Sequence, residues 1–291
     1  MSEHFTAFSF VDHITEFEPG RHARGRYAVP AGISAFPPCL VAEAIGQLAA
    51  WVAMANNDFR VRPVAALANE TRFRADVAPG AMLELAVDIE NCDEHAVAYS
   101  GRAHVGATTA IELIDCLGPM LPVEEFDSPT GLRGRFDFIR GAGAEPGAFR
   151  GVAAPRITRS GGIAGVSGRA TLRVPESAPF FGDHFPRRPV FPATLLLDAK
   201  IGFAMNIANE ATHWPPGTKL APSRMTHVKM RAFIPPGAEL QVDAELARVD
   251  DSSAIIRLGT HMDGKSVATA RLEVIAGPSP GKPVNGPGSA P

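Results

Sequence analysis

The sequence predicts an α+β chain made of two similar halves, each with one long apolar helix followed by antiparallel strands. Residues 74–83 and residues 231–240 share the pattern RAxxxPGAxL, at an offset of 157. Residues 36–55 and residues 191–211 both begin with Phe-Pro and carry an acid seven residues after the phenylalanine, at an offset of 155. The 291 residues suffice for two such units, because one domain usually needs roughly 100–200 residues.

The two Phe-Pro segments predict the helices. Pro37 and Pro192 suit a helix start, because proline is tolerated in the first turn. Each segment is apolar around most of its circumference for about 17 residues, which is typical of a buried helix.

Strand-like runs with partial alternation of apolar and polar residues follow each helix. Pro-Gly, Asp-Asp and Asp-Gly turns separate them. The runs lie at residues 82–90, 95–105 and 109–117, and again at 239–249, 253–262 and 266–275. This order predicts two antiparallel sheets, each wrapped around its long central helix.

The composition of the segments between these elements predicts the domain boundaries. We expect one unit at residues 1–122 and a second at 155–276. Residues 123–154 are rich in glycine and proline and are expected to form a surface linker, with ordered contacts at Phe136 and Phe138. Residues 277–291 offer nothing to bury and are expected to be disordered.

The overall composition excludes several classes of protein. The chain has 28 lysine and arginine residues and 31 aspartate and glutamate residues, so its formal net charge is 28 − 31 = −3. This charge argues against nucleic-acid binding by phosphate neutralisation. The three cysteines form no Cys-x-x-Cys pair, so we expect neither disulfides nor a metal site. Scattered free thiols suit a reducing compartment, so we expect a cytoplasmic protein. The most apolar stretch, 39–55, is too short and, with Glu43 and Gln47, too polar to span a bilayer, so we expect no membrane insertion.

The informative features are those that the two halves do not share. The stretch before the second helix is ten residues longer than its counterpart and contains His184, whereas the first half has no histidine there. The first helix carries Glu43 and Gln47, which lie four residues apart and therefore on one helix face. The second helix has Asp198 but Gly202 at the glutamine position. The second half thus has a loop that contains His184, called the histidine loop below, and the first half has an acid and an amide.

These segments resemble a known family. Residues 184–192, HFPRRPVFP, resemble the histidine motif of the 3-hydroxyacyl-[acyl-carrier-protein] dehydratases, and the helix around Glu43 resembles the acidic helix of that family. The resemblance covers roughly residues 8–122 and 155–276. It implies hotdog folds, in which an antiparallel sheet wraps a long central helix and the active site lies at a dimer interface. The chain would then be a double hotdog, an intramolecular pseudo-dimer that brings His184 next to Glu43 and Gln47.

The resemblance also implies an activity. The chain would be a hydro-lyase that dehydrates a 3-hydroxyacyl thioester to the trans-2-enoyl thioester in fatty acid or polyketide synthesis. His184 would be the base and Glu43 the acid, with Gln47 orienting the carboxyl group or a water molecule. No cofactor is expected beyond the phosphopantetheine arm of the substrate, which an acyl carrier protein or coenzyme A would supply. The chain either is complete alone or pairs into a homodimer of double hotdogs.

Several supporting residues are less clearly assigned. The family has a glycine after the helix proline, where this chain has Pro38 and Ala193. Because proline has no N–H, the backbone donor for the thioester oxygen would come from Cys39 in the first helix or from Ala193 in the second. Asp198 is a relic, a second acid, or a residue paired with a cation such as Lys200.

Substrate delivery and two competing functions remain open. Arg187 and Arg188 in the histidine loop either bind the carrier or its phosphate, or are ordinary solvated arginines. A hotdog thioesterase is one alternative, although such enzymes typically lack this histidine loop. A non-catalytic partner that binds an acyl group or carrier through a decayed dehydratase fold is the other alternative.

Overall fold

The two halves have the same order of elements, as the repeat predicts. The computed structural model describes residues 5–147, 149–153, 155–215 and 218–277, so the expected disordered tail lies, apart from Gly277, outside the described residues. The first half contains β1 (His13–Glu18), β2 (His22–Ala28), α1 (Pro38–Asn56), β3 (Val61–Pro63), β4 (Leu67–Phe73), β5 (Met82–Cys92), β6 (Ala96–Val105) and β7 (Thr108–Pro122). The second contains β8 (Ile157–Gly161), β9 (Ser167–Arg173), a 3-10 turn η2 (Pro179–Gly182), α3 (Ala193–Glu210), β10 (Leu220–Met230), β11 (Glu239–Val249), β12 (Ser253–Met262) and β13 (Lys265–Ala276).

The strands join in one continuous antiparallel sheet. Its order is β1-β2-β5-β6-β7-β4-β10-β13-β12-β11-β9-β8, with β3 paired to β7. Equivalent strands of the two halves occupy equivalent places from either end, so a pseudo-two-fold axis passes between β4 and β10. The two sheet halves meet there, with Met225 opposite Thr71 and Val228 opposite Ala68. The predicted α+β double hotdog is confirmed, and its two sheets are continuous through β4 and β10.

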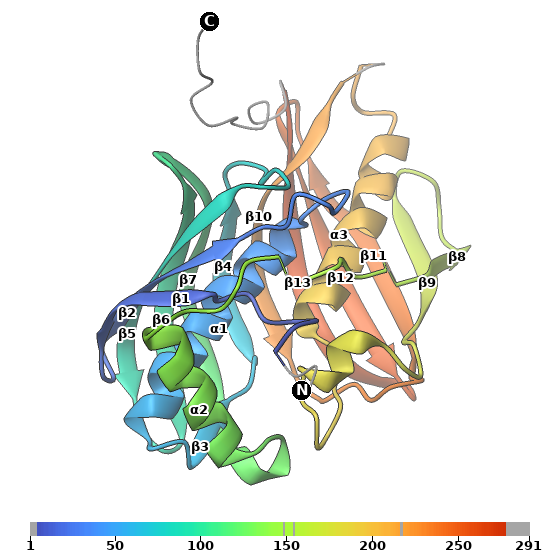
Figure 1. Ribbon diagram of the computed structural model, residues 1–291. Coiled ribbons are helices and arrows are strands. Elements are labelled where there is room, and N and C mark those ends of the chain that lie inside the picture. The colour runs from blue at the N-terminus through green and yellow to red at the C-terminus, as the bar shows by residue number, and fades with distance from the viewer. Residues whose placement is uncertain (1–4, 148, 154, 216–217, 278–291) are drawn as a thin grey trace, which may run out of the picture.

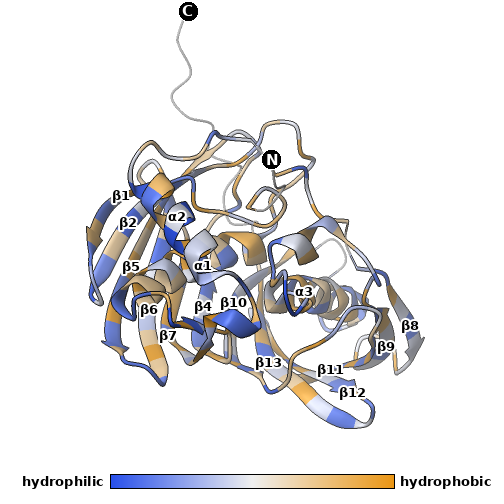
Figure 2. Cartoon of the chain, turned by 60° about the horizontal axis from the view of Figure 1, so that its bottom comes forward, coloured by the Kyte–Doolittle hydropathy of each residue, from blue (hydrophilic) through white to orange (hydrophobic). Residues whose placement is uncertain are grey.

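The two long helices lie next to each other on one side of the sheet (Figure 1). Pro37 and Pro192 precede them, as expected. The strands behind them alternate between hydrophobic and hydrophilic residues (Figure 2), and the hydrophobic positions form the buried core. Each helix therefore fills the concave side of its half of the sheet.

The expectation about the length of helix α1 needs a correction. It has 19 residues and, by length and composition, could cross a bilayer, whereas the sequence segment was expected to be too short and too polar. In the structure 61% of its apolar window is buried inside the protein. Glu43 and Gln47 also hydrogen-bond to protein groups there. The helix is thus packed as a core helix.

The segment expected to be a linker contains ordered structure. It holds a 3-10 turn, η1 (Val123–Glu125), and a helix, α2 (Pro129–Arg140), that packs on β1. Ser128 caps this helix by accepting the Gly131 N–H at 3.2 Å. Phe136 is buried against Phe17, whereas Phe138, for which contacts were expected, is 45% exposed.

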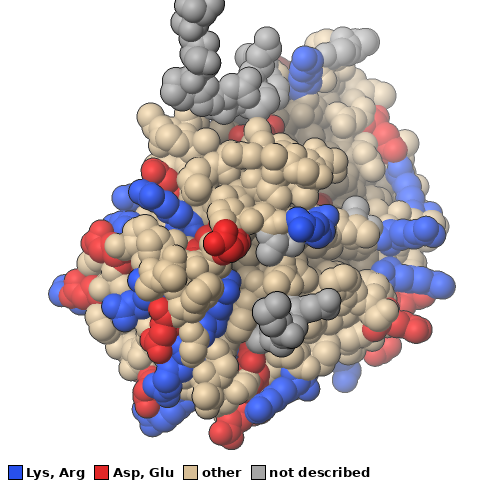
Figure 3. Space-filling view, in the orientation of Figure 1, with Lys and Arg blue, Asp and Glu red and all other residues tan. Residues whose placement is uncertain are grey.

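Charged side chains lie mainly along the two sides of the face shown in Figure 3, over the outer strands of each half. Lysine and arginine are interspersed there with aspartate and glutamate, and the middle of this face is largely uncharged.

Candidate active site

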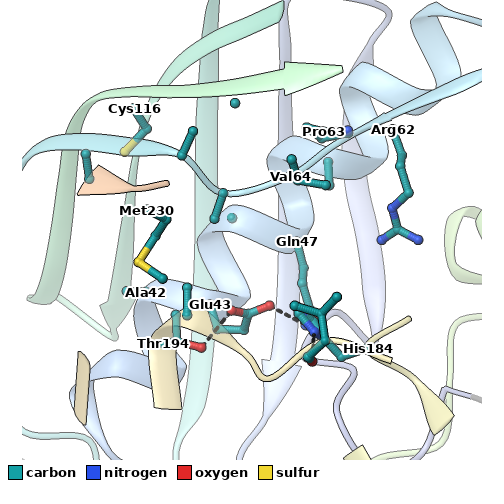
Figure 4. A pocket seen from close by; sticks show the side chains of 18 of the residues that line it. Ala42, Glu43, Gln47, Arg62, Pro63, Val64, Cys116, His184, Thr194 and Met230 are labelled. Atoms are coloured by element: carbon teal, nitrogen blue, oxygen red, sulfur yellow. Dashed lines mark hydrogen bonds between the residues drawn. The ribbon is translucent and has the colours of Figure 1, made fainter. Parts of the chain in front are cut away.

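A cavity of about 250 Å³ lies between the two halves. The first half contributes α1, β3, β4 and β7, and the second contributes the histidine loop, the start of α3 and β10. Its wall is mostly apolar, with a few polar side chains gathered near one another (Figure 4). Such a cavity, apolar with a few convergent polar groups, is typical of a small-molecule site.

Glu43 projects from α1 into this cavity and is held by two side chains (Figure 4). Gln47, one helical turn later, donates to its Oε1 at 3.0 Å. Thr194, from the first turn of α3, donates its hydroxyl to Oε2 at 2.8 Å. One donor comes from each half, so the carboxyl group is oriented across the interface.

His184 faces the same cavity from the loop that precedes α3. Its Nδ1 lies 2.9 Å from the carbonyl oxygen of Val190. Because a carbonyl oxygen only accepts, Nδ1 carries the hydrogen, and the neutral ring keeps a free lone pair on Nε2. Burial lowers the pKa of His184 below its ordinary value of 6.5, an effect that the nearby Glu43 opposes and Arg62 reinforces. The imidazole is therefore neutral at physiological pH.

The N-terminal segment, residues 5–10, lies across this site and was not foreseen. Gln47 fastens it to α1 by accepting the Phe10 N–H at 2.8 Å and donating to the Phe8 carbonyl at 3.0 Å. The carboxylate of Asp183, next to the histidine, accepts the backbone N–H groups of Phe5, Ala7 and Phe8 at 2.5–2.7 Å. The ring of Phe8 then lies edge-on to His184, with ring centres 5.6 Å apart.

The helix N-terminus at this cavity is that of α3. Ala193 and Thr194 line the cavity, whereas Pro38 and Cys39 do not belong to its wall. The first N–H groups of a helix have no acceptor within the helix and can donate to a ligand. The proline at position 38 therefore removes no donor from this cavity, and of the two expected donors only Ala193 is near it.

Comparisons with known proteins show the family of this chain. A family model described as ApeI-like dehydratase matches residues 164–270. The 3-hydroxyacyl-[acyl-carrier-protein] dehydratase FabZ of Tolumonas auensis is 30% identical over 105 residues, which are 36% of this chain and 70% of that protein. The FabZ of Streptococcus sanguinis is 27% identical over 110 residues, or 37% of this chain and 76% of that protein. The chain belongs to the hotdog dehydratase family.

Solved structures show the same fold over nearly the whole length of this chain. The tesB protein of Mycobacterium avium subs paratuberculosis aligns with a TM-score of 0.57 at 14% identity, over 90% of this chain and 96% of that one. A MaoC-like dehydratase aligns with a TM-score of 0.52 at 13% identity, over 88% and 98%. Both similarities concern the fold alone.

The position that is related to Glu43 by the pseudo-two-fold axis carries different residues. The offset of 155 between the helices makes Asp198 equivalent to Glu43 and Cys39 equivalent to Thr194. Burial raises the pKa of Asp198, and burial, with Asp198 nearby, also raises that of the Cys39 thiol. Asp198 makes no ion pair with Lys200 among the described residues, because the buried Lys200 Nζ has no hydrogen-bond partner there. A histidine and an amide, His184 and Gln47, accompany Glu43, and Asp198 has no equivalent of either.

The two loop arginines join the halves. Arg187 donates to the Glu124 carbonyl at 3.1 Å, and Arg188 pairs with Glu125 at 3.2 Å. Neither belongs to the cavity wall, and carrier binding by these arginines stays a prediction. Across the described ranges, no group of three or more histidine, cysteine, aspartate or glutamate side chains could hold a metal ion.

Proposed function

We propose that the chain dehydrates a 3-hydroxyacyl thioester to the trans-2-enoyl thioester, with His184 as the base and Glu43 as the acid. One observation carries this proposal. A histidine with a fixed tautomer and a carboxyl group held by two donors come from opposite halves and share one apolar cavity. The chemistry needs such a pair, because one group must take a proton while another gives one.

The proposed reaction is balanced by these two groups. Nε2 of His184 takes the α-proton, the electrons of that C–H bond form the new C=C bond, and the C–O bond to the 3-hydroxyl breaks. The protonated carboxyl group of Glu43 delivers a proton to the departing oxygen, which leaves as water. The proton on His184 then returns to Glu43 through solvent, and both groups are restored.

Negative charge develops on the thioester oxygen during this reaction. We assign its stabilisation to the backbone N–H groups at the start of α3, from Ala193 and Thr194, which line the cavity. Loss of one such donor typically costs about 10²–10³-fold in rate. The thioester would be held by an acyl carrier protein or by coenzyme A, in fatty acid synthesis or a related pathway.

The test is formation of the enoyl thioester from 3-hydroxyacyl carrier-protein and coenzyme A substrates, followed as loss of one water by mass spectrometry. Wild-type protein should turn over, and His184→Ala and Glu43→Gln should each lose at least about 10²-fold in rate. Asp198→Asn is the matched control, because it alters the equivalent acid outside the cavity, and it should leave the rate unchanged.

The same assay separates the competing functions. Release of a free thiol without loss of water would indicate a hotdog thioesterase instead. Binding of the acyl thioester with neither product, over several chain lengths and in the hydration direction, would indicate a non-catalytic acyl-binding partner. Either result would contradict the proposed dehydration.

A further inference from the structure

Arg62 is a buried cation next to the proposed catalytic pair, and no sequence motif points to it. It lies on β3 of the first half, and its side chain is only 12% exposed. Burial lowers its pKa to about 10, so the guanidinium stays positive at neutral pH. A buried charge is costly, so its presence in the wall of this cavity calls for an explanation.

The guanidinium stacks on the histidine loop of the other half. Its Cζ lies 4.0 Å from the centre of the Phe185 ring. That ring in turn stacks on the imidazole of His184, with centres 4.2 Å apart and planes at 24°. Arg62, Phe185 and His184 thus form a continuous contact from the first half to the proposed base.

The hydrogen bonding of Arg62 argues against a purely structural role. Its Nη1 lies 3.8 Å from Oδ2 of Asp127, and neither Nη1 nor Nε has a hydrogen-bond partner among the described residues. An apolar side chain of similar length would cover Phe185 without leaving buried donors unfilled. The charge is therefore not needed for packing on Phe185, although it also serves as the counterion of Asp127, whose side chain is only 4% exposed.

Burial is the main cause of the lowered pKa of His184, and the charge of Arg62 acts in the same direction. His184 is faced by Glu43 from α1 and by Arg62 from β3, with Asp127 beside Arg62 and Asp183 preceding the histidine in its own loop. When it is ionised, Glu43 favours the imidazolium, whereas the guanidinium favours the neutral ring that the proposed reaction needs. A base that takes an α-proton has to be neutral.

We propose that Arg62 is a positioning residue, which fixes the histidine loop from across the interface and keeps its imidazole in the neutral form. This role rests on the proposed dehydration. Other contacts hold the loop to the first half independently, since Phe126 packs edge-on to Phe185 at 5.1 Å and accepts the Arg187 N–H at 3.0 Å. Variants of Arg62 should therefore fold with the loop in place.

Two substitutions separate the two parts of this role. Arg62→Met keeps apolar cover over Phe185 and removes the charge, so the acid limb of the kcat/KM profile should move to higher pH. Arg62→Lys keeps the charge and loses the planar stack, so the limb should stay and kcat should fall by about 10–100-fold. Arg140→Met is the control, because Arg140 lies over Phe17 and Phe136 away from the cavity, and it should change neither quantity.

A titration of the His184 imidazole by NMR, assigned by the signal missing in His184→Gln, completes the test without turnover. The pKa of His184 should be higher in Arg62→Met than in the wild type. If the wild type dehydrates nothing but this shift occurs, the proposed function fails, and only the effect of Arg62 on the His184 titration stands. If the wild type is active while Arg62→Met changes neither the titration nor kcat, or raises KM alone, the inference is wrong.

Discussion

Lys200 provides a stability test with a magnitude that follows from the structure. It lies on α3, its side chain is fully buried, and its Nζ has no hydrogen-bond partner among the described residues. Burial, reinforced by the charge of Arg231, lowers its pKa from 10.5 to about 7. Between these values the unfolded chain holds a proton that the folded chain has lost, so this residue costs more stability as the pH falls.

The cost can be worked out from that difference. At about 1.36 kcal/mol per pH unit, the drop from 10.5 to about 7 corresponds to about 5 kcal/mol at and below pH 7. At pH 9.5 only one pH unit remains to 10.5, so the cost is about 1 kcal/mol. Lys200→Met removes the charge and should recover most of this free-energy cost at each pH.

The assay is urea unfolding of the wild type and Lys200→Met at pH 6 and pH 9.5. The gain in unfolding free energy should fall from about 5 kcal/mol at pH 6 to about 1 kcal/mol at pH 9.5, with unchanged slopes in urea. Lys229→Met, at an exposed position on β10, is the control and should stay within about 0.5 kcal/mol at both pH values. A gain that is the same at both pH values would refute the reasoning, because it would reflect packing alone.

Three further predictions concern the site. Thr194→Val removes the donor to Glu43 Oε2 and should lower kcat/KM by about tenfold, whereas Thr194→Ser should restore it. Asp183→Asn weakens the acceptor of three backbone N–H groups and should lower the unfolding free energy by about 1–3 kcal/mol in thermal melts. Because burial lowers the pKa of His184, the acid limb of the kcat/KM profile should lie below pH 6.5, and a limb above 6.5 would contradict this.

The sequence was most informative for features that depend on the residues of one local segment. Both central helices follow from their apolar circumference, and the equivalence of the halves follows from the repeated RAxxxPGAxL pattern. The complementary make-up of the halves was also visible, because the first half lacks the loop with His184 and the second helix has Gly202 where the Glu43 helix has Gln47. The strands that join the two sheets, β4 and β10, were not foreseen, since pairing between distant segments leaves no local pattern.

The missed features depend on contacts between the halves. Arg62 and Asp183 lie in no motif, and their partners are remote in sequence. Thr194 had a usable signal, because the offset of 155 aligns it with Cys39 one turn before the equivalent acid. Helix α2 was obscured by Gly131 and Gly134, although Ser128 followed by proline is a common helix start.

The central claim, that one site is assembled within a single chain from both halves, has a direct test. Enoyl-thioester formation would be measured for His184→Ala, for Glu43→Gln, and for the two inactive variants mixed in equal amounts. The account predicts that the mixture stays inactive, because each chain carries one defective half of its only complete pair. Recovery of activity on mixing would contradict it, since the histidine and the carboxyl group would then come from different chains.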